Sequence, residues 1–237
     1  MALNPPIQRN KDRHLYMWVA VLIPIIVLIG FARTYYLKGL FGTPALPGLL
    51  VHLHGFVMTS WVVLFITQVW LVAARRTRIH QRLGILGAIL AALVCLVGVA
   101  TAIAAAARGA AAGPEALRFL VVPFGDLLVF AILIGTALYF RRRMDIHKRL
   151  MLLAAVAILP PAFARFPLHF IQTGGSSEVF GLTDLFLLGC IIFDTIKHRR
   201  LHPVFLWGTL LLVGSQPLRL LLGSTDLWMR FATWLVG

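Results

Sequence analysis

Residues 83–107 read LGILGAILAALVCLVGVATAIAAAA and contain no charged side chain. Because a helix needs about 20 apolar residues to cross the hydrocarbon core of a membrane, this stretch is long enough to span a bilayer. Of the 237 residues in the chain, 60% are hydrophobic and 13% are charged. Soluble domains carry about 25% charged residues. The composition therefore excludes a soluble domain and predicts an integral membrane protein.

Similar apolar runs recur along the chain, separated by charged or Gly- and Pro-rich breaks. We predict an all-α polytopic membrane bundle of about seven transmembrane helices. The expected spans are residues 15–32, 48–74, 83–107, 119–140, 150–171, 179–196 and 203–222. Pro160, Pro161 and Pro167 fall within the fifth span, so we expect that helix to be kinked or broken.

The distribution of basic residues predicts the orientation, because cytoplasmic loops are enriched in Lys and Arg. One face carries fifteen Lys and Arg residues and the other carries seven. This places the N-terminus in the cytoplasm and the C-terminus outside. The expected organisation is a cytoplasmic tail at 1–14, a single transmembrane domain at 15–222 and an outer-face segment at 223–237.

The net charge of +14 raises the question of nucleic acid binding. The basic residues lie in short clusters between the spans, and no polar domain presents them. We therefore expect anionic lipid headgroups at the cytoplasmic face, and not nucleic acid, to be their partners.

A repeat occurs at the predicted inner face. Residues 75–83 (RRTRIHQRL) and 142–150 (RRMDIHKRL) are identical at six of nine positions, and residues 200–203 (RLHP) form a weaker copy. This pattern indicates one anchor helix followed by three helical hairpins. Its histidines, His80, His147 and His202, could ligate metal or haem, or could satisfy backbone groups and headgroups at helix starts.

Five polar side chains fall at comparable depth in the outer half of four predicted spans. They are Asp126, Arg165, Asp184, Gln216 and Arg219. A charge inside a membrane is costly unless it faces a partner or a cavity. We expect these residues to form either a buried ion-pair network that fixes helix packing or a polar pocket that opens outward.

Three histidines lie still nearer the outer face: His52 and His54 at the start of the second span and His169 at the end of the fifth. Two histidines from different helices could bind haem b axially. Histidine with Asp126 or Asp184 could instead hold a transition metal. Because helical positions two apart diverge by about 200°, only one of His52 and His54 would act with His169.

Motifs of well-known enzyme classes are absent from the sequence. It contains no Cys-x-x-Cys-His, His-Glu-x-x-His, Walker or Gly-x-Ser-x-Gly motif. The sequence leaves an enzymatic activity open and names no catalytic residue.

A set of short motifs is distributed over the second to seventh spans. They are His-Leu-His-Gly at 52–55 with Trp61 and Gln68, the segment 75–84, Arg-Leu-His-Pro at 200–203 and Ser-Gln-Pro-Leu-Arg at 215–219. With these motifs the chain resembles a family of uncharacterised bacterial multi-span inner-membrane proteins. It is also similar in general style to histidine-bearing cytochrome b-type and oxidase-assembly membrane proteins, whose ligand motifs do not match residue by residue. The resemblance implies a bacterial inner-membrane location.

Two hypotheses for function follow from the sequence. The first is a protein that binds haem or a metal ion through His54 and His169, with His52 as an alternative ligand, for electron transfer or respiratory-complex assembly. In this hypothesis another membrane protein would be a partner. The second is a small-molecule transporter or a structural subunit with a buried Asp/Arg network.

Overall fold

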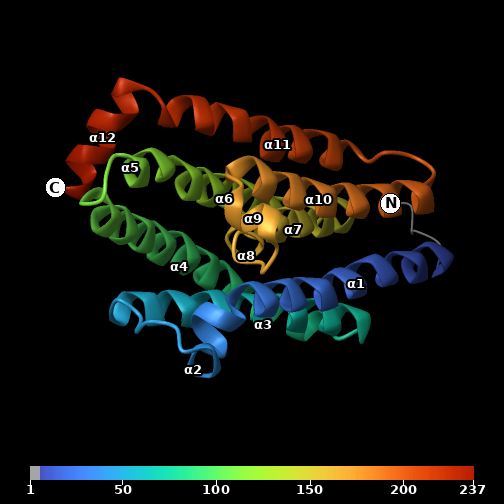
Figure 1. Cartoon of the computed structure of the whole chain (residues 1–237). Coiled ribbons are helices and arrows are strands. Elements are labelled where there is room, and N and C mark those ends of the chain that lie inside the picture. The colour runs from blue at the N-terminus through green and yellow to red at the C-terminus, as the bar shows by residue number, and fades with distance from the viewer. Residues whose placement is uncertain (1–5) are drawn as a thin grey trace. The chain divides into compact units, whose positions relative to one another are not determined.

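The computed structural model describes the backbone from residue 6 to residue 237 and the side chains from His14 onwards. Residues 1–5 of the expected tail at 1–14 lie outside the described residues. The described chain is helical and has no strand (Figure 1). Its elements are α1 (Pro6–Phe31), η1 (Ala32–Tyr36, a π-helix), α2 (Lys38–Phe41), α3 (Leu49–Ala73), α4 (Thr77–Ala110), α5 (Glu115–Phe119), α6 (Val121–Tyr139), α7 (Met144–Ala157), α8 (Pro160–Phe163), α9 (His169–Thr173), α10 (Ser176–His198), α11 (Pro203–Gly223) and α12 (Asp226–Val236).

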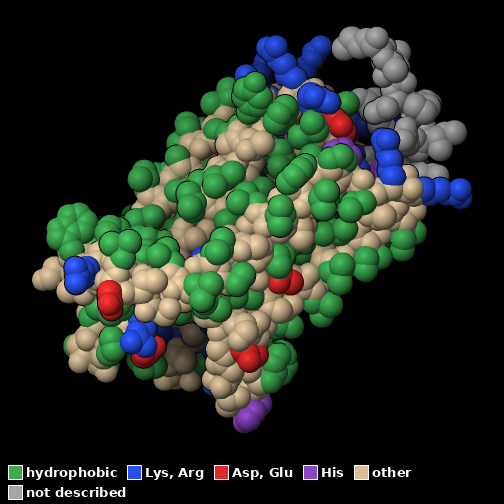
Figure 2. Space-filling view, turned by 90° about the horizontal axis from the view of Figure 1, so that it is seen from above, with side chains coloured by type: hydrophobic (Ala, Val, Ile, Leu, Met, Phe, Trp, Pro, Cys, Tyr) green, Lys and Arg blue, Asp and Glu red, His purple; other side chains and the backbone are tan. Residues whose placement is uncertain are grey.

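The predicted all-α membrane bundle is confirmed. In the described part of the chain, seven helical segments are long and apolar enough to cross a membrane. They are His14–Tyr36, Leu49–Ala73, Thr77–Ala110, Glu115–Tyr139, Met144–Phe163, Ser176–His198 and Pro203–Gly223. Hydrophobic side chains cover much of the face shown in Figure 2, with few charged side chains between them. Such a surface is suited to lipid and not to water.

Helices α4 and α7 begin several residues before their apolar runs. α4 starts at Thr77 and α7 at Met144, so the repeated basic segments form the first turns of these helices. A charged residue does not end a helix, because its side chain can reach headgroups while its backbone continues the hydrogen-bond ladder. Hydropathy marks the hydrocarbon-facing part of a helix and misses this extension.

The fifth span is broken, as its prolines predicted. α7 ends at Ala157, and the short helix α8 starts with Pro160 and Pro161 in its first turn. Proline is tolerated there because the first amides of a helix have no intrahelical acceptor. α9 begins only at His169 and lies beyond the fifth span-length segment.

The chain forms two compact units. Unit 1 comprises the residues up to Pro44, Thr59–Ala88 and Leu159–Leu206. Unit 2 comprises Ala45–Met58, Ile89–Ile158 and Trp207–Gly237.

Within unit 1, α8 packs against both α1 and α10. The contact between α1 and α8 requires a glycine. A Cβ atom added to Gly30 would lie 2.3 Å from the carbonyl oxygen of Ala162. The buried side chains of this unit include Val19, Ile23, Leu159, Phe163 and Leu187.

Within unit 2, α6 and α7 form a closely packed hairpin. Its core consists of buried aliphatic and aromatic side chains, among them Val129, Phe130, Leu133, Leu152 and Leu153. α11 approaches α7 at Gly208, where an added Cβ would lie 2.3 Å from Cδ1 of Leu153.

Candidate functional site

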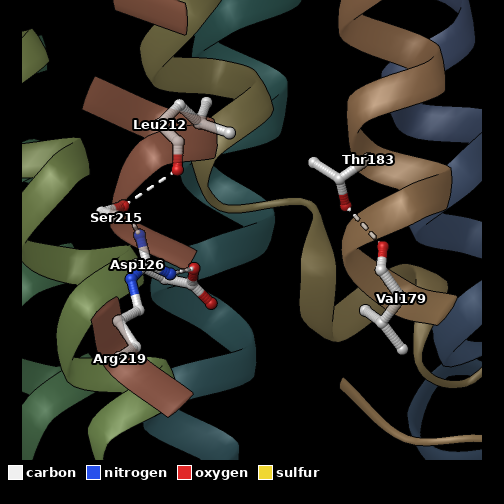
Figure 3. A network of polar contacts seen from close by, with 6 residues as sticks. All are labelled: Asp126, Val179, Thr183, Leu212, Ser215 and Arg219. Carbon is white, nitrogen blue, oxygen red and sulfur yellow. Dashed lines mark hydrogen bonds and ion pairs between the residues drawn. The ribbon is translucent and has the colours of Figure 1, made fainter. Parts of the chain in front are cut away.

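Asp126 on α6 and Arg219 on α11 form a buried ion pair within unit 2 (Figure 3). Nη1 of Arg219 donates a hydrogen bond to Oδ1 of Asp126 at 2.5 Å. Each residue exposes only 6% of its surface. Because both helices are span-length segments, the pair joins two of the expected transmembrane helices far from each other in sequence.

A short chain of hydrogen bonds extends from the guanidinium. Nη2 of Arg219 donates to Oγ of Ser215 at 2.8 Å. That hydroxyl donates in turn to the carbonyl oxygen of Leu212 at 2.9 Å. Positions four apart lie on the same face of a helix, so Ser215 and Arg219 point to the same side of α11. Gln216, the neighbouring polar residue, is also buried.

Gly125 makes room for the arginine. An added Cβ at this position would lie 2.3 Å from both Cδ and Nε of Arg219, closer than real Cβ contacts occur. The side chain of Arg219 therefore passes directly over the backbone of α6 before it reaches the next residue, Asp126. A side chain at 125 would force the arginine to move.

The two charges of the pair compensate each other, which offsets the free-energy cost of burying a charge in a membrane. Removing one member of a buried ion pair leaves the other charge uncompensated, which costs several kcal/mol. Arg219 also presents a planar set of donors that matches a carboxylate. In this structure the guanidinium of Arg219 holds the carboxylate of Asp126.

Two further residues predicted for this network belong to unit 1. Arg165 follows α8 and is exposed. Its Nη1 donates to the carbonyl oxygen of Pro161 at 2.6 Å, and its guanidinium lies 4.7 Å from the ring centroid of Phe31. Asp184 is half-buried on α10. On the same helix Thr183 is fully buried, and its hydroxyl donates to the carbonyl oxygen of Val179 at 3.0 Å (Figure 3).

The three histidines predicted for the outer face are distributed over both units. His52 is exposed and His54 half-buried on α3, in the part of that helix that belongs to unit 2. His169 is exposed at the start of α9 in unit 1. Among the residues with described side chains, no group of three or more His, Cys, Asp or Glu could hold a metal ion.

Two of the histidines predicted for the inner face bond to backbone groups at helix ends. Nδ1 of His147 lies 2.8 Å from the carbonyl oxygen of Ala137, so this nitrogen must carry the proton because a carbonyl only accepts. Ala137 lies in the last turn of α6, where carbonyls have no intrahelical partner. The backbone amide of Val204 donates to Nδ1 of His202 at 3.2 Å.

The remaining histidine of the repeat, His80, accepts a hydrogen bond through its backbone carbonyl. Nε2 of Gln68 on α3 donates to the carbonyl oxygen of His80 on α4 at 3.3 Å. His80 and His147 occupy the same position, the fourth residue of their helices, whereas His202 directly precedes α11. In the third copy of the repeat, the histidine therefore lies just before its helix and not within it.

Sequence reasoning did not single out two charged residues that the structure buries almost completely, Asp194 and Arg149. Oδ2 of Asp194 lies 3.5 Å from Nδ1 of His198, one helical turn later on α10. Nη1 of Arg149 donates to the carbonyl oxygen of Asp145 at 2.9 Å. The Asp-x-x-x-His spacing was a usable signal for the first. Arg149 was hidden among exposed arginines of the repeat.

In comparisons with known proteins, the chain matches no family model, no curated protein and no solved structure.

Proposed function

We propose that this chain is a membrane transporter of a small carboxylate-bearing solute and that the ion pair between Asp126 and Arg219 is its functional centre. The observation that carries the proposal is the burial of this pair between two span-length helices. Buried ionisable groups in transmembrane segments commonly mark solute and proton pathways.

The helix that carries Arg219 is weakened close to the pair. Pro217 lies inside α11, and because proline has no amide hydrogen, one backbone hydrogen bond is missing there. The hydroxyl of Ser215 bonds to the carbonyl of Leu212 in the preceding turn. Prolines and side-chain insertions of this kind are the usual causes of helix bending. Interrupted helices beside a binding site are common in transporters.

The chemistry of the pair supports the class of solute. A guanidinium can bind a carboxylate through paired hydrogen bonds. In this structure the carboxylate of Asp126 accepts a hydrogen bond from Nη1 of Arg219. A solute carboxylate of similar geometry would compete with Asp126 for the guanidinium. Protonation of Asp126 would release Arg219 for the solute and would couple solute movement to a proton.

Uptake into vesicles tests this proposal. The purified protein is reconstituted into phosphatidylcholine vesicles with a pH gradient, and uptake of radiolabelled acetate, lactate and succinate is measured. We expect uptake of at least one of these by the wild type and its loss in Asp126→Asn and Arg219→Gln. Arg219→Lys, which keeps the charge but not the planar set of donors, should remain folded and transport poorly. A wild type without uptake of any of the three contradicts the proposal.

We propose haem binding for electron transfer as a second candidate. The half-buried position of His54 favours it over the exposed His52 as a ligand with His169. A haem needs only these two axial ligands, whereas a metal ion would need further ligands such as Asp126 or Asp184. Protein expressed with added haem precursor should then show a Soret band that His169→Ala removes. Absence of both this band and stoichiometric metal by mass spectrometry would overturn this candidate.

We also propose, from loop charge, that the N-terminus is cytoplasmic and that the basic loops face anionic headgroups. The resemblance to bacterial multi-span proteins supports the bacterial inner membrane as the location.

A further inference from the structure

The C-terminal helix α12 has three distinct faces. Side chains at 228 and 232 are buried against the protein, those at 227, 231 and 234 are apolar and exposed, and those at 226, 230 and 233 are polar and exposed. Each set follows the spacing of three and four residues that places side chains on one side of a helix. Contact with protein explains the buried face and contact with water explains the polar face, but neither explains the exposed apolar face.

The protein-facing side fixes α12 to unit 2. Nε1 of Trp228 donates to the carbonyl oxygen of Leu117 on α5 at 2.9 Å. Its ring meets that of Phe124 edge-on, with the centroids 6.2 Å apart. The start of the helix is capped, because Oγ1 of Thr225 accepts a hydrogen bond from the amide of Trp228 at 3.2 Å. These contacts hold α12 against the rest of unit 2.

The exposed apolar face is large for so short a helix. Leu227 is 75% exposed and Trp234 74% exposed, and Phe231 lies between them on the same side. Tryptophan combines a broad apolar ring with a polar N–H group and is enriched where membrane meets water. Arg230, on the adjacent polar face, adds a positive charge that suits a lipid phosphate.

The position of α12 in the chain places this face at the membrane boundary. α11, a span-length helix, ends at Gly223, and only Ser224 and Thr225 separate it from α12. In Figure 1, α12 turns sharply away from the direction of α11 and does not continue it. A helix that leaves a transmembrane segment in this way begins at the level of the lipid headgroups.

We propose that α12 docks on the bilayer surface, with Leu227, Phe231 and Trp234 inserted at the boundary between headgroups and acyl chains and Arg230 at the phosphates. The partner is lipid, because the exposed face joins a membrane-spanning helix and combines tryptophan with a basic residue. Through Trp228 and Phe124 this surface contact reaches α6, on which Asp126 follows two residues after Phe124.

Spin labels on α12 test the docking. Single cysteines replace Leu227, Trp234, Arg230 or Thr233 in full-length protein in which Cys95 and Cys190 are alanine, reconstituted in phosphatidylcholine vesicles. Labels at 227 and 234 should collide more with oxygen, which concentrates in lipid, than with a water-soluble nickel chelate. Labels at 230 and 233, the matched controls, should show the opposite ratio.

Two results would overturn the proposal. Nickel accessibility at 227 and 234 equal to that at 230 would mean that the face meets water. Shielding of 227 and 234 from both reagents would mean that a second copy or another protein covers it. Quenching of tryptophan fluorescence by brominated phosphatidylcholine gives an independent measurement in protein that keeps its cysteines: Trp234→Phe should lower the quenched fraction, and Trp228→Phe should not.

Discussion

At the scale of residues, Asp126 and Arg219 form a buried ion pair within unit 2. Both charges are buried, so each depends on the other for compensation. We expect Asp126→Ala to lower the free energy of unfolding by about 3–5 kcal/mol and Arg219→Ala to have an effect of similar size. The double variant should lose clearly less than the sum, as measured by reversible unfolding in detergent micelles. Strictly additive losses would show that the two side chains do not act as a pair.

We predict that the stability of the protein depends on Gly125, because the absence of a side chain at this position leaves room for Arg219. Gly125→Ala should lower stability by about 1–3 kcal/mol, since the new methyl group would occupy the path of Arg219. Gly135→Ala on the same helix is the matched control: nothing lies within 4 Å of its added Cβ, and the change should be neutral or stabilising by up to about 1 kcal/mol. In an Arg219→Ala background the cost of Gly125→Ala should disappear. A cost that persists there would assign Gly125 to some other packing role.

The sequence predicted two of the buried charges, Asp126 and Arg219, but not that they pair with each other, and it missed Asp194 and Arg149. Asp126 and Arg219 were recognisable because each interrupts an apolar run. Depth along a helix follows from counting residues, but the direction of a side chain around the helix axis relative to another helix does not. The choice among the arginines for Asp126 therefore needed coordinates. The role of Gly125 was invisible, because a glycine in an apolar run shows no signal of what packs on it.

At the scale of elements, His147 joins the start of α7 to the end of α6. Its bond to the carbonyl of Ala137 satisfies a group that would otherwise lack a partner at a helix end. His147→Ala should therefore lower the free energy of unfolding by about 1–2 kcal/mol in thermal or denaturant unfolding of the detergent-solubilised protein. His169→Ala, in protein without haem, is the control, since His169 is exposed and should change stability little. Equal losses of stability in His147→Ala and His169→Ala would show that the bond of His147 does not join α7 to α6.

The elements themselves were largely predictable. Apolar length identified the seven span-length segments, and the prolines near 160 identified the break after α7. The starts of α4 and α7 were missed because hydropathy does not register basic residues in a helix. α12 was expected only as a segment, although its period of apolar residues could have identified a helix. The π-helix η1 carries no sequence signal that we can name.

At the scale of the whole molecule, the orientation in the membrane is a prediction from charge. Fifteen Lys and Arg residues on one face and seven on the other favour a cytoplasmic N-terminus. A reporter enzyme that works only outside the cytoplasm should be active when fused after Gly237 and inactive when fused after Arg142. A cytoplasmic reporter should give the complementary result at both positions. The reverse pattern would invert the topology of every loop.

If the chain is a transporter, the ion pair does more than hold α6 and α11 together. Attraction between two charges is enough to hold the two helices together. A solute site, in contrast, needs the guanidinium on α11, beside Ser215 and close to Pro217. Exchanging the two residues keeps the attraction and moves the guanidinium to α6. The exchanged protein therefore separates the two roles.

The most direct measurement is solute uptake by vesicles that contain this exchanged variant, Asp126→Arg with Arg219→Asp, together with its thermal stability. If Arg219 binds the solute from α11, the variant should regain much of the stability that either single substitution loses, and uptake should stay absent. Full recovery of both stability and uptake would contradict a solute site at Arg219, because the pair would then act through its attraction alone.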